Sequence, residues 1–188
     1  MGTNNTGDNC RIETYPLPKG SNANTALSNH QQGAITSNPQ TPLASSGIVG
    51  TLVVAVKESG NFLVNQSFSY EASTGAGGGT PQVLWQLVRR TGAFLVNGVA
   101  PTPGFFLFPT DTGGTATTLM STANTFLNGD LEGADAHHLH ALDISGQPAG
   151  ALVAYDLIFT SGIPLTTISF PNATPSNPLG QFSVLEVL

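Results

Sequence analysis

Two histidines separated by one residue are the side chains of this sequence best suited to metal chemistry. His138 and His140 lie in the stretch DAHHLHALDI, shortly after Asp135. On a β-strand, residues i and i+2 point to the same face, so both imidazoles can reach one transition-metal ion. A catalytic metal centre needs a third protein ligand, and none follows at a suitable spacing. The alternative is a pair of partly buried histidines at a subunit contact, where their protonation would make the contact pH-sensitive.

An acidic turn just before the histidines offers oxygen ligands for calcium. Asn128, Asp130 and Glu132, with Gly133, stand where an EF-hand loop has its first ligands and its glycine. The bidentate glutamate at the twelfth position of such a loop is missing, because Leu139 stands there. The turn is therefore either a candidate site for a structural Ca2+ ion or a solvated hairpin, and the sequence indicates no other cofactor.

No enzyme signature accompanies these residues. The chain has no G-x-S-x-G motif, no Walker loop and no G-x-G-x-x-G motif. Its one cysteine, Cys10, is far from the histidines in sequence, and a single cysteine excludes an internal disulfide. Cys10 is either a free thiol or half of an intermolecular bridge. We therefore expect a protein that is not an enzyme.

The low charge of the chain favours a protein that packs among copies of itself. Only 9% of the 188 residues are charged, against about 25% in a typical soluble domain. Thr, Ser, Asn, Gln and Gly must therefore cover the surface, and little charge repulsion keeps copies apart. Lys and Arg together number 5 and the net charge is −6, so nucleic-acid binding is not expected. No apolar run approaches the roughly 18 residues of a membrane span.

Residues 1–46 differ in composition from the rest of the chain and are expected to form an extended N-terminal assembly arm. They are rich in Asn, Thr, Ser, Gln and Pro, and their one concentrated apolar group is Ile12, Tyr15 and Leu17. Pro16 and Pro18 hold that group extended and exclude it from the middle of a sheet. We expect the arm to dock on a neighbouring subunit, by strand addition or by wrapping. The alternative is an arm folded back on its own domain.

Residues 47–188 have the pattern of a β-sandwich domain. Short apolar runs alternate with turn residues, and no stretch has a sustained helical period. Asn97-Gly98 and Asn128-Gly129 are strong hairpin signals, whereas the glycine-rich stretches 75–79 and 112–114 indicate longer loops. Many short strands at regular spacing are typical of a sandwich or barrel. The expected strands are residues 47–56, 61–70, 82–90, 93–97, 104–109, 115–121, 124–128, 137–144, 150–160, 165–170 and 180–188.

The strand expected at 150–160 is apolar on both faces. One face carries Val153, Tyr155, Leu157 and Phe159, and the other carries Leu152, Ala154, Asp156 and Ile158. A sandwich strand usually hides only one face, so this pattern predicts a second covering layer, which another subunit would supply. Asp156 then needs a buried partner, and Arg89 or Arg90 is the candidate.

The phenylalanines that follow Pro101 and Pro103 have two interpretations. Phe105 and Phe106 form either an exposed contact patch, suited to a carbohydrate or a receptor, or part of the core.

Three stretches carry a resemblance to known families. VLWQLVRRTG, the HLHAL that contains the two histidines, and the closing FSVLEVL resemble the jelly-roll modules of the C1q and tumour-necrosis-factor type in bacterial spore-surface and exosporium proteins. The low charge and the polar arm are similar to viral jelly-roll capsid and decoration proteins. The resemblance implies a jelly-roll sandwich that forms trimers or filament subunits with exchanged arms. The His-x-His pattern also resembles the first metal motif of cupins, although Val153 lies near the position of the third cupin histidine.

The sequence therefore predicts an all-β protein, a jelly-roll-type antiparallel β-sandwich with an extended N-terminal arm. The expected function is a self-assembling structural protein. It would be a repeating subunit of a virion shell or decoration, or of an extracellular or spore-surface filament, with itself as its partner. The alternatives are a carbohydrate- or receptor-binding adhesion module and a cupin-like metalloprotein.

Overall fold

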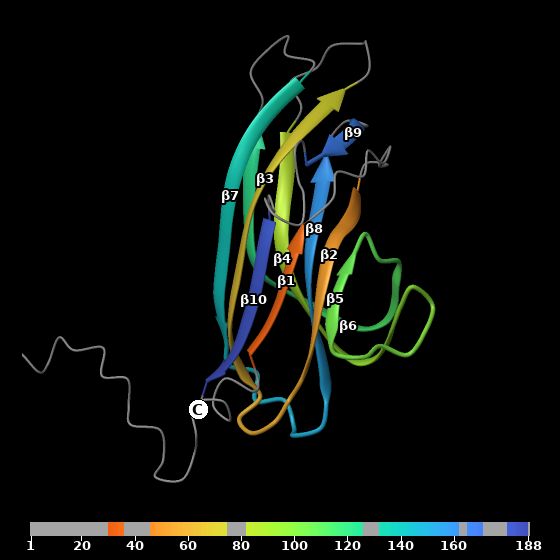
Figure 1. Ribbon diagram of the computed structural model, residues 1–188, viewed down its shortest axis with the longest axis vertical. Helices are drawn as coiled ribbons and strands as arrows, with labels where there is room; N and C mark the ends of the chain where they lie inside the picture. Colours follow the sequence, from red (N-terminus) through yellow and green to blue (C-terminus); the bar gives the residue numbers. More distant parts are fainter. Residues whose placement is uncertain are drawn as a thin grey trace, which may run out of the picture.

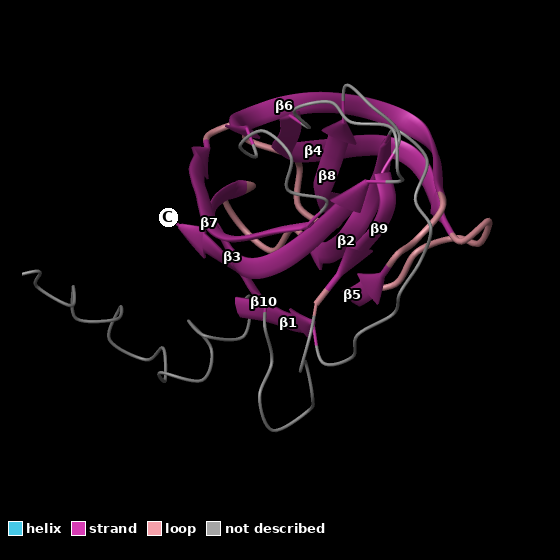
Figure 2. Ribbon diagram, turned by 90° about the horizontal axis from the view of Figure 1, so that it is seen from above, coloured by secondary structure: helices cyan, strands magenta, loops and turns pink. Residues whose placement is uncertain are grey.

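The computed structural model describes residues 30–35, 46–74, 82–125, 132–161, 165–170 and 180–187. They form two antiparallel sheets that pack face to face, with the strands along the long axis of the molecule (Figures 1 and 2). The all-β class and the antiparallel β-sandwich expected from the sequence are confirmed. The described ranges contain no helix that is long and apolar enough to cross a membrane.

Each sheet joins strands that are distant in the sequence. The first sheet has the order β1 (His30–Ile35), β10 (Gly180–Val187), β3 (Asn61–Thr74) and β7 (Glu132–Asp143), and β9 (Leu165–Ser169) pairs with the far end of β3. The second sheet has the order β5 (Gly104–Leu107), β2 (Ser46–Ala55), β8 (Leu152–Ser161), β4 (Gln82–Val96) and β6 (Asp111–Thr125). The chain passes repeatedly from one sheet to the other, although β4, β5 and β6 all belong to the second sheet.

The core between the sheets follows from the alternation of apolar residues. In β8, the face predicted from the sequence is fully buried: Val153, Tyr155, Leu157 and Phe159 are each 0% exposed. The largest side chain, Trp85 of β4, lies among aromatic rings of the first sheet. Its ring centre is 4.6 Å from that of Phe68 and 4.6 Å from that of Tyr70. Burying a large apolar side chain contributes about 1.5–3 kcal/mol, so this layer is the main stabilising term of the fold.

Part of the outer face of the second sheet, around Val53 of β2 and Ala154 of β8, is covered by the chain itself. Residues 94–111, which we call the cover segment, comprise the end of β4, β5 and the start of β6. Phe94 and Val96 of this segment form a second apolar cluster with Val53 of β2 and Ala154 of β8. The second layer that the two-sided strand predicted therefore comes from the same chain, and the expectation that another subunit supplies it was wrong at this face.

Glycines allow β4 and β6 to curl into the cover segment without ending. The sequence predicted two strands separated near residue 92 and a loop at 112–114, but β4 and β6 are each continuous. Gly92, Gly113 and Gly114 have φ angles of 82°, 77° and 72°, and the pairing shifts register between Thr91 and Phe94. Positive φ favours glycine and marks a bulge that bends and twists the ladder. The hairpin signal at Asn97-Gly98 is confirmed, with φ angles of 53° and 79° and a bridge between Val96 and Val99.

Strand β1 lies inside the stretch that the sequence analysis assigned to the arm. It pairs along its whole length with β10 of the same chain. The sequence HQQGAI has little apolar alternation, so no strand was expected there. Contacts with other strands stabilise β1 instead. Ile35 is fully buried, and Phe105 of β5 packs over Gly33 so closely that a Cβ atom there would lie 2.3 Å from the ring.

Candidate functional site

The outer face of the first sheet, which we call the open face, carries side chains in rows across the strands. Three of these rows are Leu185, Leu63 and Leu142 from β10 to β7; Gln32, Ser183, Asn65 and His140 from β1 to β7; and Ala34, Gln181, Ser67 and His138 from β1 to β7. No Asp, Glu, Lys or Arg stands in these rows. In the described residues no segment lies across this face as the cover segment lies across the other one.

The first row is apolar and exposed. Leu142 is 61% exposed, Leu63 is 36% exposed, and Leu185 beside it is half-buried. Ile144, immediately after β7 on the same side, is 75% exposed. Single exposed apolar residues are common, but a contiguous exposed group of them marks an interaction surface.

The two histidines lie on the open face, at its β7 edge. Both side chains are exposed, and their ring centres are 5.5 Å apart with an angle of 68° between the ring planes. The prediction that they share a face is confirmed. His137 has the opposite orientation: its ring lies 5.8 Å from that of Tyr70 and 5.7 Å from that of Phe68, in the core. Among the three histidines of β7, only His138 and His140 are therefore available together to a ligand from solvent.

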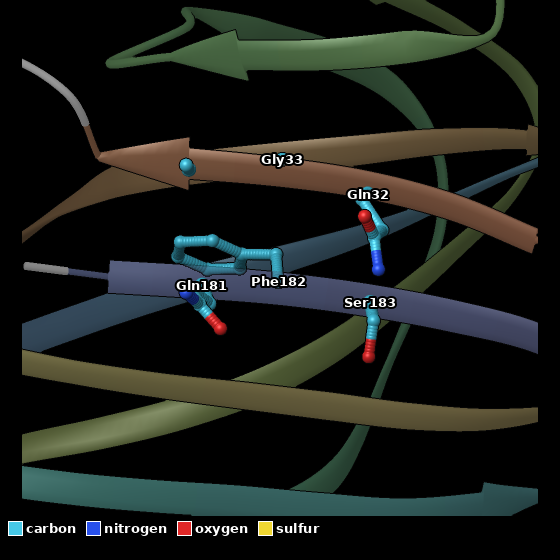
Figure 3. A pocket seen from close by; sticks show the side chains of 6 residues that line it. Gln32, Gly33, Gln181, Phe182 and Ser183 are labelled. Carbon is cyan, nitrogen blue, oxygen red and sulfur yellow. The ribbon is translucent and has the colours of Figure 1, made fainter. Parts of the chain in front are cut away.

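A hollow of about 560 Å³ lies between β1 and β10 (Figure 3). It is lined by Gln32, Gly33, Ala34, Gln181, Phe182 and Ser183. Gln181 and Ser183 point to one side of β10 and Phe182 points to the other. The Phe182 ring belongs to the core, where its side chain is 1% exposed. The hollow therefore offers neutral hydrogen-bonding groups and no charge.

The acidic turn is only partly within the described residues. Asn128 and Asp130 lie outside them, as do Ile12, Tyr15 and Leu17 of the expected arm. Glu132 and Asp135 belong to β7, where their backbones pair with Ser73 and Tyr70 of β3. The structure describes no group of three His, Cys, Asp or Glu side chains that would hold a metal ion.

The two phenylalanines of the expected contact patch lie on opposite faces of β5 and are half-buried. The ring of Phe105 is 4.9 Å from that of Phe182, so it closes one edge of the sandwich. Phe106 packs on the cluster of the cover segment. These contacts fit the alternative interpretation, in which both residues are part of the core.

A buried ionic cluster lies under the cover segment. Asp156, which is 0% exposed, accepts hydrogen bonds from Nε and Nη2 of Arg90 at 3.2 and 3.0 Å. The Thr51 hydroxyl lies 2.7 Å from Oδ1 of Asp156 and 3.2 Å from Oδ2 of Asp111. Burial raises the pKa of Asp156 to about 6, although the hydrogen bond from Thr51 and the charge of Arg90 oppose the rise. The partner that the sequence predicted for Asp156 is confirmed as Arg90.

The adjacent arginine joins the two sheets. Arg89 donates to Oδ1 of Asp143 at 2.6 Å, and the Tyr155 hydroxyl donates to Oδ2 of the same carboxylate at 2.8 Å. Burial, with the neighbouring Asp143 carboxylate, raises the pKa of the Tyr155 phenol above its usual range, so it stays a hydrogen-bond donor. Strands β4 and β8 of the second sheet are thereby connected to β7 of the first.

The apolar row and the hollow were not predicted from the sequence. Leu63, Leu142 and Leu185 are far apart in the sequence, and only the pairing of β10, β3 and β7 aligns them. The sequence did contain a signal. Each of these leucines is next in sequence to a residue of the buried face, at a position where a strand with one solvated face usually has a polar residue. No protein-family model matches the chain, and a search of curated proteins found none that is similar to it.

Proposed function

We propose that this protein is a self-assembling structural protein, a repeating subunit of a virion shell or decoration or of an extracellular or spore-surface filament. The observation that carries the proposal is the open face, which combines an exposed apolar row with uncharged polar rows. Association through such a face removes apolar surface from water at about 25 cal/mol per Å². It buries no charge from these rows, so it avoids the desolvation cost of an ion.

The arm enters the proposal through residues 1–29, because β1 pairs with β10 of its own chain, as in the alternative of an arm folded back on its domain. His30, where β1 begins, pairs with Leu185 of the apolar row, so residues 1–29 join the sandwich at that row. Leu17 is separated from His30 by a length of chain that can span up to about 45 Å when extended. Ile12, Tyr15 and Leu17 are therefore within reach of a neighbouring copy that sits on the open face. Exchange of arms between copies is the form of assembly that we propose.

The test compares one charge placed at two equally exposed apolar residues. Leu142 on the open face is 61% exposed, and Val99 on the cover segment is 62% exposed. We expect the wild-type protein to form higher oligomers in light scattering and regular assemblies in negative-stain micrographs. Leu142→Asp should shift it to monomers, whereas Val99→Asp should assemble as the wild type does. Deletion of residues 1–20 should leave a folded protein that no longer assembles.

Two results would contradict the proposal. One is a wild-type protein that remains monomeric at high concentration. The other is equal assembly of the Leu142→Asp and Val99→Asp proteins, because association would then use some surface other than the open face. Circular dichroism of each variant shows that the sandwich is intact.

The hollow between β1 and β10 favours a second candidate function, adhesion to a neutral carbohydrate. Gln32, Gln181 and Ser183 supply amide and hydroxyl groups, which pair with sugar hydroxyls without charge. Specific binding of the wild type on a glycan array, lost in Gln181→Ala, would support this function. Absence of binding by the wild type would remove it.

A further inference from the structure

We propose that His138 and His140 together bind a divalent transition-metal ion such as Zn2+ on the open face, and that the same pair from a second copy completes its coordination. Completion of the site by a second copy rests on the proposed function. The chelating pair itself depends only on the geometry of β7.

The spacing of the two rings fits a shared ligand. A Zn–N bond of about 2.0–2.1 Å, plus about 1.1 Å from the nitrogen to the ring centre, puts each ring centre about 3.2 Å from the metal. At the tetrahedral angle of about 109°, two such rings have centres about 5 Å apart. The observed separation is 5.5 Å. Both rings are exposed, so small rotations about their side-chain torsions can bring one nitrogen of each to the ion.

The surroundings of the pair suit a cation that prefers nitrogen. Imidazole is a good ligand for Zn2+, Cu2+ and Ni2+, whereas Mg2+ prefers oxygen. Asn65 and Ser67 are the cross-strand neighbours of His140 and His138. Their side-chain oxygens are able to accept the remaining ring N–H groups, which fixes the orientation of a metal-ligating histidine. No Lys or Arg stands in these rows of the open face, so no fixed positive charge opposes a metal ion there.

The two described imidazoles fill half of a four-ligand zinc site, and we assign the other half to a second copy. The described side chains supply two imidazoles and no third His, Cys, Asp or Glu, whereas zinc in a structural site has four ligands. Two copies that meet face to face about a two-fold axis place the same residues opposite each other. Their two pairs then supply four imidazoles. Zinc would therefore join two open faces at the β7 edge and strengthen the contact made by the apolar row.

The experiment uses untagged full-length protein and measures two quantities. Equilibrium dialysis gives the Zn2+ bound per chain, and light scattering gives the mass with and without Zn2+. We expect one zinc per two chains, an increase in mass with Zn2+, and no increase with Mg2+. His138→Asn and His140→Asn should each weaken zinc binding at least tenfold. The matched control is His30→Asn, because His30 lies on β1 at the opposite edge of the same sheet and should leave binding unchanged.

The outcomes separate the two proposals. If the wild type assembles but zinc binding is absent, or is equal in wild type, His138→Asn and His140→Asn, the metal site is refuted and the proposed function stands. If one zinc binds per chain through both histidines and the mass stays that of a monomer, the chelating pair is supported and the bridge between copies is refuted. A zinc-dependent mass in the Leu142→Asp protein that is lost with His138→Asn supports the bridge without help from the apolar row.

Discussion

The two outer faces of the sandwich differ in what lies against them. On the second sheet, residues 94–111 of the same chain cover Val53 and Ala154 and enclose an ion pair between Arg90 and Asp156. On the first sheet, an apolar row and a pair of histidines face outward from β3, β7 and β10. Both faces carry apolar residues where a solvated sheet has polar ones, but among the residues that the structure describes, a covering segment lies only on the second sheet.

The difference shows how a strand with apolar residues on both faces should be interpreted. Such a strand predicts a covering layer, but its sequence does not say which chain supplies that layer. At β8 the layer is the cover segment, which buries charge as well as apolar surface. In the three rows of the open face no Asp, Glu, Lys or Arg is present, and a second copy is the cover that we propose. The following predictions test this contrast, beginning with the largest effect.

The strongest test replaces one apolar residue on each face with alanine. Phe94, in the cover segment, is 5% exposed, whereas Leu142 on the open face is 61% exposed. We expect Phe94→Ala to lower the free energy of unfolding by about 3–5 kcal/mol, because it empties a packed cluster. Leu142→Ala should change it by less than about 0.5 kcal/mol in dilute, unassembled protein. Urea unfolding measures both values, and similar losses would show that the two faces do not differ as described.

The fold was predictable because its apolar pattern is local. The grouping of Val153, Tyr155, Leu157 and Phe159 on one face of β8 followed from the two-residue period of a strand, and the turn Asn97-Gly98 was identified from two residues. The cover segment was not predictable, because the glycines that flank it look like strand ends in the sequence. Whether Gly92 or Gly114 ends a strand or bends it depends on the pairing of β4 with β6, which joins residues far apart.

The second prediction concerns the charge enclosed under the cover segment. Arg90→Met leaves the Asp156 carboxylate buried without its cation, and breaking a buried ion pair costs about 3 kcal/mol or more. We expect a loss of about 3 kcal/mol at pH 7, which becomes smaller near pH 5 because Asp156 can then hold a proton. The control is Lys57→Met, an exposed cation, for which we expect a change below about 0.5 kcal/mol. A loss that is independent of pH would contradict the assignment to Asp156.

The third prediction follows from the pKa of Asp156. Burial raises this pKa to about 6, from an ordinary value of 3.8. Between these values the folded state keeps a proton that the unfolded state has released, so the free energy of unfolding falls as pH rises. The contribution is roughly 2–3 kcal/mol between about pH 4 and about pH 6, at about 1.4 kcal/mol per pKa unit.

Unfolding of Asp156→Asn across the same pH range isolates this contribution. The variant lacks the titrating carboxyl but keeps every other ionisable group, so the wild type should lose stability more steeply than the variant as pH rises. Parallel curves for the two proteins would mean that Asp156 does not hold its proton to about pH 6.

The candidate site was predictable only where it depends on one strand. The shared face of His138 and His140 follows from the two-residue period of β7, and the partner of Asp156 follows from the scarcity of cations. The period does not tell which face of β7 is exposed, because His137 is just as polar as His138 and His140 and yet faces the core. The apolar row also depends on three strands whose registers no local pattern fixes.

The adjacent arginines of β4 also bear on how this chain selects its strand alignment. Consecutive residues of a strand point to opposite faces, so Arg89 reaches Asp143 between the sheets and Arg90 reaches Asp156 under the cover segment. A slip of β4 by one residue against β8 would exchange these directions. One arginine would then take the place of the other, so the dipeptide supplies a cation to both faces of β4 even when the strand slips. What a slip of one residue does disrupt is the core, because it would turn Trp85 and Leu87 out of the space between the sheets.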